Sequence, residues 1–210
     1  MLIPFDQLFA RHNVEPVGVL HLGANTGQEA EAYHKQGVKR VIWIEANPDL
    51  MPALKKYLEP YPLQRAICAC VSDQTGTSVT FHIANNDGQS SSFLEFGTHA
   101  KEHPSVRYCS HIHMRTDRVD ELFHLLGISL EPRGWFLNVD IQGAELLALK
   151  GMGSLLWQFN WAYIEVNERE LYKGCPLVGE IDAYLQTFGF AGVETKMTGA
   201  GWGDKLYVRV

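Results

Sequence analysis

The stretch that decides the fold of this chain is Val19-Leu20-His21-Leu22-Gly23-Ala24-Asn25-Thr26-Gly27-Gln28-Glu29. The apolar run Val17–Leu22 predicts a buried strand, and Gly23 and Gly27 allow the backbone behind it to turn tightly. The helical pattern that begins at Gln28 then offers the free N–H groups of a helix N-terminus. This order of strand, glycine turn and helix predicts a ligand site at the end of the first strand.

A second apolar run, Val41–Ile44, ends at the acidic residue Glu45. In a strand–helix–strand unit, a carboxylate at this place accepts hydrogen bonds from both hydroxyls of a ribose. The turn and the acid together predict a site for a nucleotide-like ligand.

The remaining sequence continues the alternation of helical and strand patterns. Helices are expected at Ile3–Arg11, Glu29–Gln36, Pro48–Leu58, Arg118–Leu126, Leu146–Lys150 (stopped by Gly151) and Leu177–Phe188. Strands are expected at Gln64–Val71, Ser78–Ile83, Cys109–Arg115, Trp135–Asp140, Trp161–Val166, Gly192–Met197 and Asp204–Val210. The turn at Ser72–Gly76 predicts a hairpin, and the glycine-rich turn at Thr198–Gly203 predicts a second one that closes the sheet.

The predicted architecture is one α/β domain over residues 1–210, in which residues 1–14 form an N-terminal helical extension. Its centre is a seven-stranded, mostly parallel sheet with an antiparallel C-terminal hairpin and helices on both faces.

Composition excludes several classes of protein. The 46% hydrophobic and 20% charged residues are typical of a globular domain, and a net charge of −6 argues against a surface for nucleic acid. The start of the chain does not resemble a signal peptide, and no apolar run is long enough to cross a membrane, so a cytoplasmic protein without a membrane partner is expected. The four scattered cysteines predict buried free thiols.

Residues 84–105 show no strong period and are rich in Asn, Ser, Gly and His. A stretch of this kind inside a compact domain is a surface loop or a functional one. The functional alternative is a lid over a substrate pocket, with Ser91 and Ser92 as anchors and substrate-binding residues.

Polar residues follow the two central strands near the middle and end of the chain. Asp140 is expected in the crevice at the carboxyl end of its strand, where it is a candidate general base, although an aspartate there also suits a helix cap. Gln142 and Glu145 follow it, and Glu145 suits either the first turn of a helix or a substrate contact. Glu165 and Asn167 end the next strand and could complete a polar substrate pocket.

Histidines are frequent between His99 and His124, which raises the question of a metal site. His111 and His113 would share one face of a strand, a spacing compatible with a pair of ligands. Because no matching cysteine or acidic cluster accompanies them, no metal is expected. Either histidine is a second candidate for the general base, since the pKa of imidazole lies near neutrality.

An ordered set of motifs carries a resemblance to a known family. Leu22-Gly-Ala-Asn-Thr-Gly27, Ile44-Glu-Ala-Asn-Pro48, Val71-Ser-Asp-Gln-Thr-Gly76, Val139-Asp-Ile-Gln-Gly-Ala-Glu145, Leu149-Lys-Gly151 and Ile164-Glu-Val166 occur in this order. Together they resemble the FkbM family of S-adenosylmethionine-dependent methyltransferases over almost all of the chain from Val17 onward. The resemblance implies a class I methyltransferase fold and transfer of a methyl group to a hydroxyl of a sugar or other natural product.

The resemblance also implies roles for individual residues. The turn of Gly23, Ala24, Asn25 and Gly27 would approach the methionine part of the cofactor, and Glu45 would hold the ribose. Ala46 and Asn47 would line the adenine side, Asp73 would lie near the adenine amino group, and Asp140 would stand at the reactive end.

The chain departs from the family pattern at two positions. The family often has an acidic residue where this chain has His21, in contact with the cofactor's ammonium group, and a lysine where it has Asn138. Two other functions fit a similar sheet: a nicotinamide oxidoreductase and a module that binds the cofactor without catalysis. The glycine spacing argues against the first, because it lacks the extra glycine of a G-x-G-x-x-G turn.

Overall fold

The computed structural model describes residues 2–210. Its centre is a seven-stranded sheet in the order β3-β2-β1-β7-β8-β10-β9. The strands are β1 (Val19–Leu22), β2 (Val41–Glu45), β3 (Gln64–Cys68), β7 (Trp135–Val139), β8 (Phe159–Asn167), β9 (Phe190–Met197) and β10 (Trp202–Arg209). All neighbouring pairs are parallel except those of β10, which runs antiparallel to both β8 and β9. The predicted sheet and its C-terminal hairpin are therefore confirmed.

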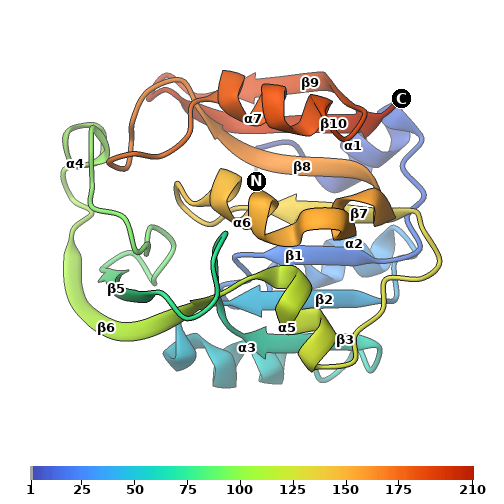
Figure 1. Cartoon of the computed structure of the whole chain (residues 1–210), viewed down its shortest axis with the longest axis horizontal. Helices are drawn as coiled ribbons and strands as arrows, with labels where there is room; N and C mark the ends of the chain where they lie inside the picture. Colours follow the sequence, from blue (N-terminus) through green and yellow to red (C-terminus); the bar gives the residue numbers. More distant parts are fainter. Residues whose placement is uncertain (1) are drawn as a thin grey trace.

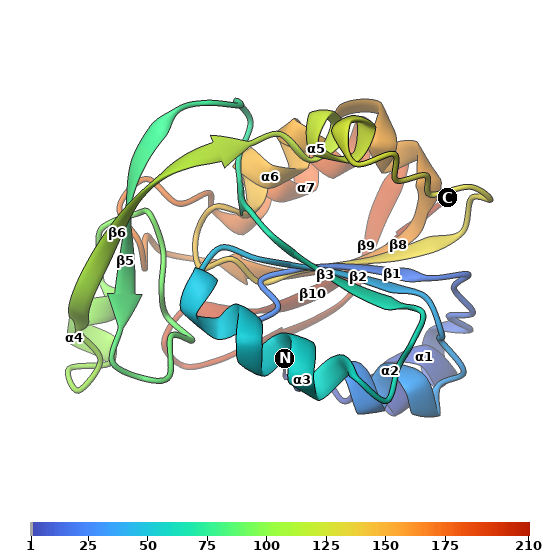
Figure 2. The same ribbon diagram turned by 90° about the horizontal axis from the view of Figure 1, so that it is seen from below.

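Helices cover both faces of this sheet (Figures 1 and 2). One face carries α1 (Phe5–His12), α2 (Ala30–Lys35) and α3 (Met51–Leu58), with the short 3₁₀ turn η1 (Pro48–Leu50) before α3. The other carries α5 (Val119–Leu125), α6 (Glu145–Met152) and α7 (Val178–Gln186), and η2 (Gly153–Gln158) follows α6. Each layer encloses its own apolar core, because the central strands are buried on both sides.

A second, three-stranded sheet stands at the carboxyl ends of the parallel strands (Figure 1). It contains β4 (Cys70–Val71), β5 (Ser78–Ala84) and β6 (Tyr108–Asp117) in the order β4-β6-β5, and α4 (His99–Glu102) lies beside it. The hairpin predicted between 64–71 and 78–83 is wrong, since β5 pairs with β6 and β3 pairs with β2. The run from 64 divides after Cys68, because β3 belongs to the main sheet and β4 to the small one.

Two further local predictions need correction. Gly151 does not stop α6: the helix continues to Met152, and Gly153, which has a φ of 50°, caps its C-terminus. A Cβ at Gly151 would lie 2.0 Å from the carbonyl oxygen of Ser72, so this glycine allows close packing of α6 on the chain that follows β4. All four cysteines are free, but Cys68 and Cys109 are exposed, the former because it ends the edge strand β3.

The helix predicted near the N-terminus is present as α1, and its Phe5, Leu8 and Phe9 are buried. No helix within residues 2–210 has the length and apolar character needed to span a membrane.

Candidate active site

The candidate site lies where the strand order of the main sheet reverses, between β1 and β7. Ligands of open α/β sheets bind at this point, outside the carboxyl ends of the strands. Two adjoining cavities open here. Both are lined by Gly23, Asn25, Gln89, Asp140 and Gln142. A single elongated ligand could therefore extend from one cavity into the other.

The turn after β1 packs directly against the end of β7. Gly23 has a φ of 88°, and a Cβ on it would lie 1.7 Å from the carbonyl oxygen of Asp140. Only glycine allows the ends of β1 and β7 to approach this closely. Asn25 also has a left-handed backbone, with a φ of 45°, and its side-chain oxygen accepts a hydrogen bond from the N–H of Thr26.

Glu45 lies in the first cavity, buried at the end of β2. Its two carboxylate oxygens accept hydrogen bonds from the N–H groups of Asn25 and Asn47, both at 2.7 Å. Burial raises the pKa of Glu45, and these two N–H groups act in the opposite direction. The carboxylate is thus fixed by the turn while remaining accessible to a ligand.

The other wall of the first cavity is apolar. Ile44, Ala69, Val71, Phe81, Phe93 and Ile141 line it beside Glu45 and Ala46. These apolar side chains offer a surface on which a heterocyclic ring can pack, next to the fixed carboxylate of Glu45.

Asp140 follows β7 and lines both cavities. Gln142 donates from Nε2 to Asp140 at 2.6 Å and to Glu165 at 2.8 Å, and its Oε1 accepts from the Tyr172 hydroxyl at 2.6 Å. Glu165 comes from β8 and lines the second cavity. The structure therefore joins three of the predicted residues, Asp140, Gln142 and Glu165, into one hydrogen-bonded group.

Residues 84–105 form one side of the cleft and are held in place by hydrogen bonds to the rest of the domain. The Ser91 hydroxyl accepts from the N–H of Ala84 at 3.0 Å, and Ser91 lines the first cavity. The Ser92 hydroxyl donates to the carbonyl of Gln142 at 2.8 Å but lines neither cavity. Backbone hydrogen bonds from Gly97 and His99 to Leu171 fasten the wall to the chain after β8.

His21 lies on β1 and lines the second cavity. Its Nδ1 is 3.2 Å from the Tyr33 hydroxyl and 3.3 Å from Nδ2 of Asn138, and its ring stacks on Trp43. Burial lowers the pKa of His21 to about 3, so the imidazole is neutral. The two departures from the family pattern, His21 and Asn138, thus contact each other and share a partner in Tyr33.

Several predicted residues support the site from outside the cavities. Glu145 is buried and accepts from the N–H groups of Ile141 at 3.2 Å and Gly143 at 3.0 Å, so it shapes the turn before α6. Asn167 is buried at the end of β8. Ala24, Gly27, Asn47, Asp73 and these two residues line neither cavity.

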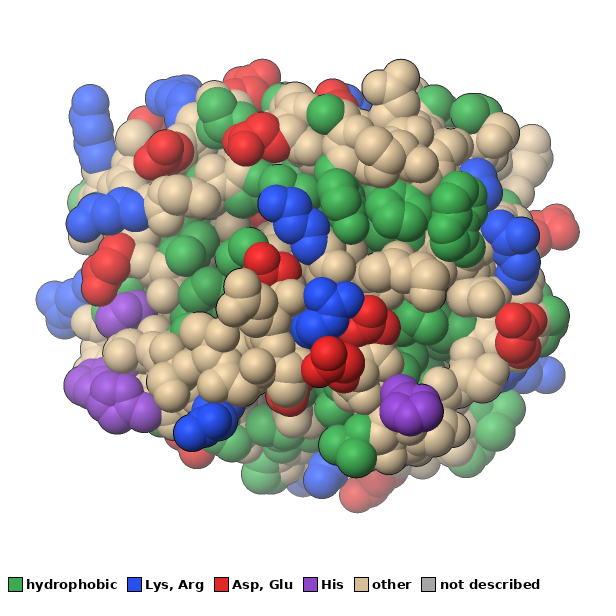
Figure 3. Space-filling view, viewed as in Figure 1, with side chains coloured by type: hydrophobic (Ala, Val, Ile, Leu, Met, Phe, Trp, Pro, Cys, Tyr) green, Lys and Arg blue, Asp and Glu red, His purple; other side chains and the backbone are tan. Residues whose placement is uncertain are grey.

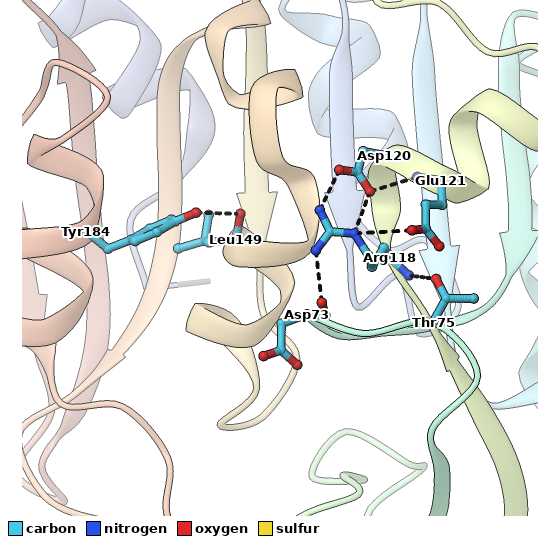
Figure 4. A network of polar contacts seen from close by, with 7 residues as sticks. All are labelled: Asp73, Thr75, Arg118, Asp120, Glu121, Leu149 and Tyr184. Carbon is cyan, nitrogen blue, oxygen red and sulfur yellow. Dashed lines mark hydrogen bonds and ion pairs between the residues drawn. The ribbon is translucent and has the colours of Figure 1, made fainter.

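Asp73 belongs to a separate polar network (Figure 4). Its main-chain carbonyl accepts from Arg118 at 2.9 Å, while its carboxylate points away from the guanidinium. The Arg118 guanidinium also pairs with the carboxylate of Asp120, and the main-chain N–H of Arg118 donates to the hydroxyl of Thr75 at 2.9 Å. This network fixes the loop after β4 to the start of α5.

His111 and His113 do not join the other site residues. They lie exposed on β6, where Ile112 is opposite Phe81 of β5. Since Phe81 lines the first cavity and side chains alternate along a strand, the two histidines lie on the opposite face of the small sheet. Figure 3 shows histidines gathered near this end of the molecule, and it shows Lys and Arg interspersed with Asp and Glu on the same view.

Some residues that line the second cavity were not among the site residues expected from the sequence. His99 and His103 line the second cavity together with Glu29 and Trp202. Burial lowers the pKa of His99 to about 4, and its Nδ1 has no partner among the described residues. The four-residue spacing of His99 and His103 within the irregular stretch was the signal that could have identified them.

The charge of the cleft is one-sided. Glu45, Asp140, Glu165 and Glu29 line it, and no Lys or Arg among residues 2–210 does so. Buried acids without a cation favour a positively charged ligand. The sulfonium and ammonium of S-adenosylmethionine, together with its adenine and ribose, fit this set of residues. Within the same residues, no group of three or more His, Cys, Asp or Glu is arranged to hold a metal ion.

Comparison with known proteins agrees with this geometry. Residues 21–191 match the Methyltransferase FkbM domain, and the chain belongs to this family. A curated relative, the 2-O-methyltransferase NoeI of Sinorhizobium fredii (strain NBRC 101917 / NGR234), is 27% identical over 176 residues, which are 80% of this chain and 70% of that protein.

Two solved structures share the fold. Fibrillarin of Aeropyrum pernix, in complex with natively bound S-adenosyl-L-methionine, has a TM-score of 0.52 and 13% identity, over 92% of this chain and 67% of fibrillarin. Magnesium protoporphyrin IX methyltransferase of Synechocystis PCC 6803, with bound cofactor, has a TM-score of 0.51 and 11% identity, over 98% of this chain and 76% of that enzyme. The predicted family and the class I methyltransferase fold are confirmed, and S-adenosylmethionine is the cofactor that the family assignment supports.

Proposed function

We propose that this member of the FkbM methyltransferase family transfers the methyl group of S-adenosylmethionine to a hydroxyl oxygen of a carbohydrate or secondary metabolite. The observation that carries the proposal is the cleft itself. The fixed carboxylate of Glu45 lies at one end and the group around Asp140 lies at the other, with the Gly23 turn between them. The curated 2-O-methyltransferase relative supports an oxygen acceptor.

The cofactor would lie across the two cavities. Glu45 accepts hydrogen bonds from the ribose hydroxyls, and the apolar wall around Val71 and Phe81 receives the adenine. The methionine part passes Gly23 toward the second cavity, where uncompensated acids face its positive charges. The cofactor supplies the methyl group; the chain holds it and the acceptor in line and receives the acceptor's proton.

The second cavity would hold the acceptor. Trp202 lines it and offers an indole face on which a sugar ring can lie, while Glu165, Gln142 and His99 offer polar contacts. A small molecule or glycan acceptor and a cytoplasmic location remain predictions from the sequence.

Calorimetric titration with S-adenosylmethionine and with its demethylated product tests the first part of the proposal. Both should bind, and Glu45→Ala should weaken both by about 10- to 100-fold, the worth of a hydrogen bond to a charged group. Glu59→Ala, which changes an exposed glutamate at the end of α3, should leave both affinities unchanged. Absence of binding to the folded protein would contradict the proposal.

Transfer itself is tested with isotope-labelled methyl donor and a panel of sugars and hydroxylated metabolites. A methyl ether among the products supports the proposal. Cofactor binding without transfer to any member of a broad panel would instead favour a non-catalytic binding module, and an absorbance change with a nicotinamide cofactor would favour an oxidoreductase.

A further inference from the structure

The side-chain amide of Gln142 bridges two acidic side chains of the cleft, Asp140 and Glu165. One side-chain nitrogen, Nε2 of Gln142, donates both of its hydrogens to carboxyl groups, at 2.6 Å to Asp140 and at 2.8 Å to Glu165. The hydroxyl of Tyr172 donates to Oε1 at 2.6 Å and so fixes which end of the amide faces the acids.

The backbone of Gln142 is held as firmly as its side chain. Its φ of 56° lies in the left-handed region, which residues other than glycine seldom adopt. The Ser92 hydroxyl donates to its carbonyl oxygen at 2.8 Å. An unusual backbone conformation fixed at a ligand cleft is a sign of a positioned functional group.

Charge decides how many protons the two acids hold. Their carboxyl groups share one nitrogen donor, so they are close, and Glu165 is buried. Two carboxylates sharing a buried site cannot both be ionised without a large cost. Burial, and next the charge of Asp140, raises the pKa of Glu165 well above its usual range.

The surroundings of this pair are mostly acidic. No Lys or Arg among residues 2–210 lines either cavity. The titratable groups around the pair are His21 of β1, Glu29 before α2, Glu45 of β2, His99 and His103 of the 84–105 stretch, Glu145 of α6, Tyr172 after β8 and Asp204 of β10. Burial keeps His21 and His99 neutral, and five of the others are acids or a phenol. Because these surroundings disfavour further negative charge, they reinforce retention of one proton by the pair.

We propose that Asp140 and Glu165 hold one proton between them, that Gln142 positions this pair, and that Asp140 is the member that accepts the proton of the acceptor hydroxyl. The last point rests on the proposed function. In the step, the acceptor oxygen bonds to the methyl carbon, the carbon–sulfur bond breaks with its electrons passing to sulfur, and the hydroxyl proton passes to the Asp140 carboxylate. Glu165 keeps its proton throughout, so the pair begins with one negative charge and ends neutral.

Gln142 is a positioning residue in this scheme. One N–H of its amide stabilises the ionised form of Asp140. The other donates to one carboxyl oxygen of Glu165, so the protonated oxygen of Glu165 can face Asp140. Without the amide, the ionised form of the pair loses a hydrogen bond, so the pair should take up its second proton at a higher pH.

The experiment is a pH titration of the side-chain carboxyl carbons by ¹³C NMR, with Asp140→Asn and Glu165→Gln to assign the two signals. In the unchanged chain we expect two separated titration steps, which belong to the pair as a unit. Gln142→Leu should raise the lower step by about one to two pH units, equivalent to the loss of one hydrogen bond to a charged group.

Gln89→Leu is the matched control. Gln89 lines both cavities but makes no side-chain hydrogen bond within the described residues, so the same chemical change there should leave both steps in place. Tyr172→Phe keeps the amide and both acids and removes only the orienting hydroxyl. It should shift the lower step in the same direction by less than Gln142→Leu, and it provides the test if the leucine variant does not fold.

The inference is overturned if both carboxyl signals of the unchanged chain titrate together below about pH 5, or if the Gln89 and Gln142 variants shift the lower step equally. This titration needs no acceptor and no methyl transfer. Separated steps in a protein that binds no S-adenosylmethionine would therefore overturn the proposed function and the role of Asp140 as base, and would leave the shared proton standing.

Discussion

Glu145 provides the sharpest test of the energetics of this site. Its side chain is fully buried, one oxygen accepts from two N–H groups and the other, Oε2, has no partner among the described residues. Burial is the main reason that the pKa of Glu145 rises from 4.5 to about 7. The Gln side chain carries no ionisable group. We therefore expect the free energy of unfolding of Glu145→Gln, relative to that of the unchanged chain, to rise as the pH increases from acidic to above neutral.

The sign and size follow from proton linkage. Between pH 4.5 and about 7 the folded state binds the proton and the unfolded state releases it, so stability of the unchanged chain falls as pH rises through this window. One pKa unit corresponds to about 1.4 kcal/mol, which makes the full penalty about 3 kcal/mol. For a chain of this length, that amounts to about 6 to 12 °C in melting temperature.

The assay is urea unfolding of the unchanged chain and of Glu145→Gln at several pH values from 4.5 to 8. The substituted amide leaves an unpaired N–H in place of Oε2, which adds a cost that does not vary with pH. The decisive quantity is therefore how much the stability difference between Glu145→Gln and the unchanged chain changes from low to high pH. Glu168→Gln, which changes an exposed glutamate, is the control. A stability difference that is constant across this range would refute the reasoning.

Two further predictions concern the turn after β1 and the small sheet. Gly23→Ala should prevent folding or cost at least about 4 kcal/mol in urea unfolding, because its Cβ would lie 1.7 Å from the carbonyl oxygen of Asp140. Gly37→Ala, with a similar φ of 81° and nothing within 4 Å, should cost only about 1–2 kcal/mol; equal losses would contradict the steric argument. His111→Ala and His113→Ala should leave cofactor affinity and methyl transfer unchanged, as measured by calorimetry and labelled-methyl assay, and a large loss in either variant would place that histidine in the reaction.

Local patterns were enough to predict much of the fold. The strands β1 and β2 are buried on both faces, so the apolar runs Val17–Leu22 and Val41–Ile44 that predicted them are recognisable without their neighbours. The turn at Ser72–Gly76 led to a wrong prediction, because a glycine turn between two strand patterns indicates a hairpin whether or not the two strands pair with each other. Pairing of β5 with β6 joins segments separated by the whole 84–105 stretch, and no local signal encodes that contact.

The same division applies to the site. Sequence by itself determined the family, the glycine turn and the strand-end acids Glu45 and Asp140, since strand ends in a parallel sheet meet at one edge. Tertiary structure decided which polar residues face the cleft: it directs His111 and His113 away and brings in His99 and His103. It also decided that Gln142 joins two acids. The direction and burial of a side chain depend on contacts between elements distant in the chain. Burial in turn shifts the pKa values of titratable side chains in the cleft, such as Glu165 and His99.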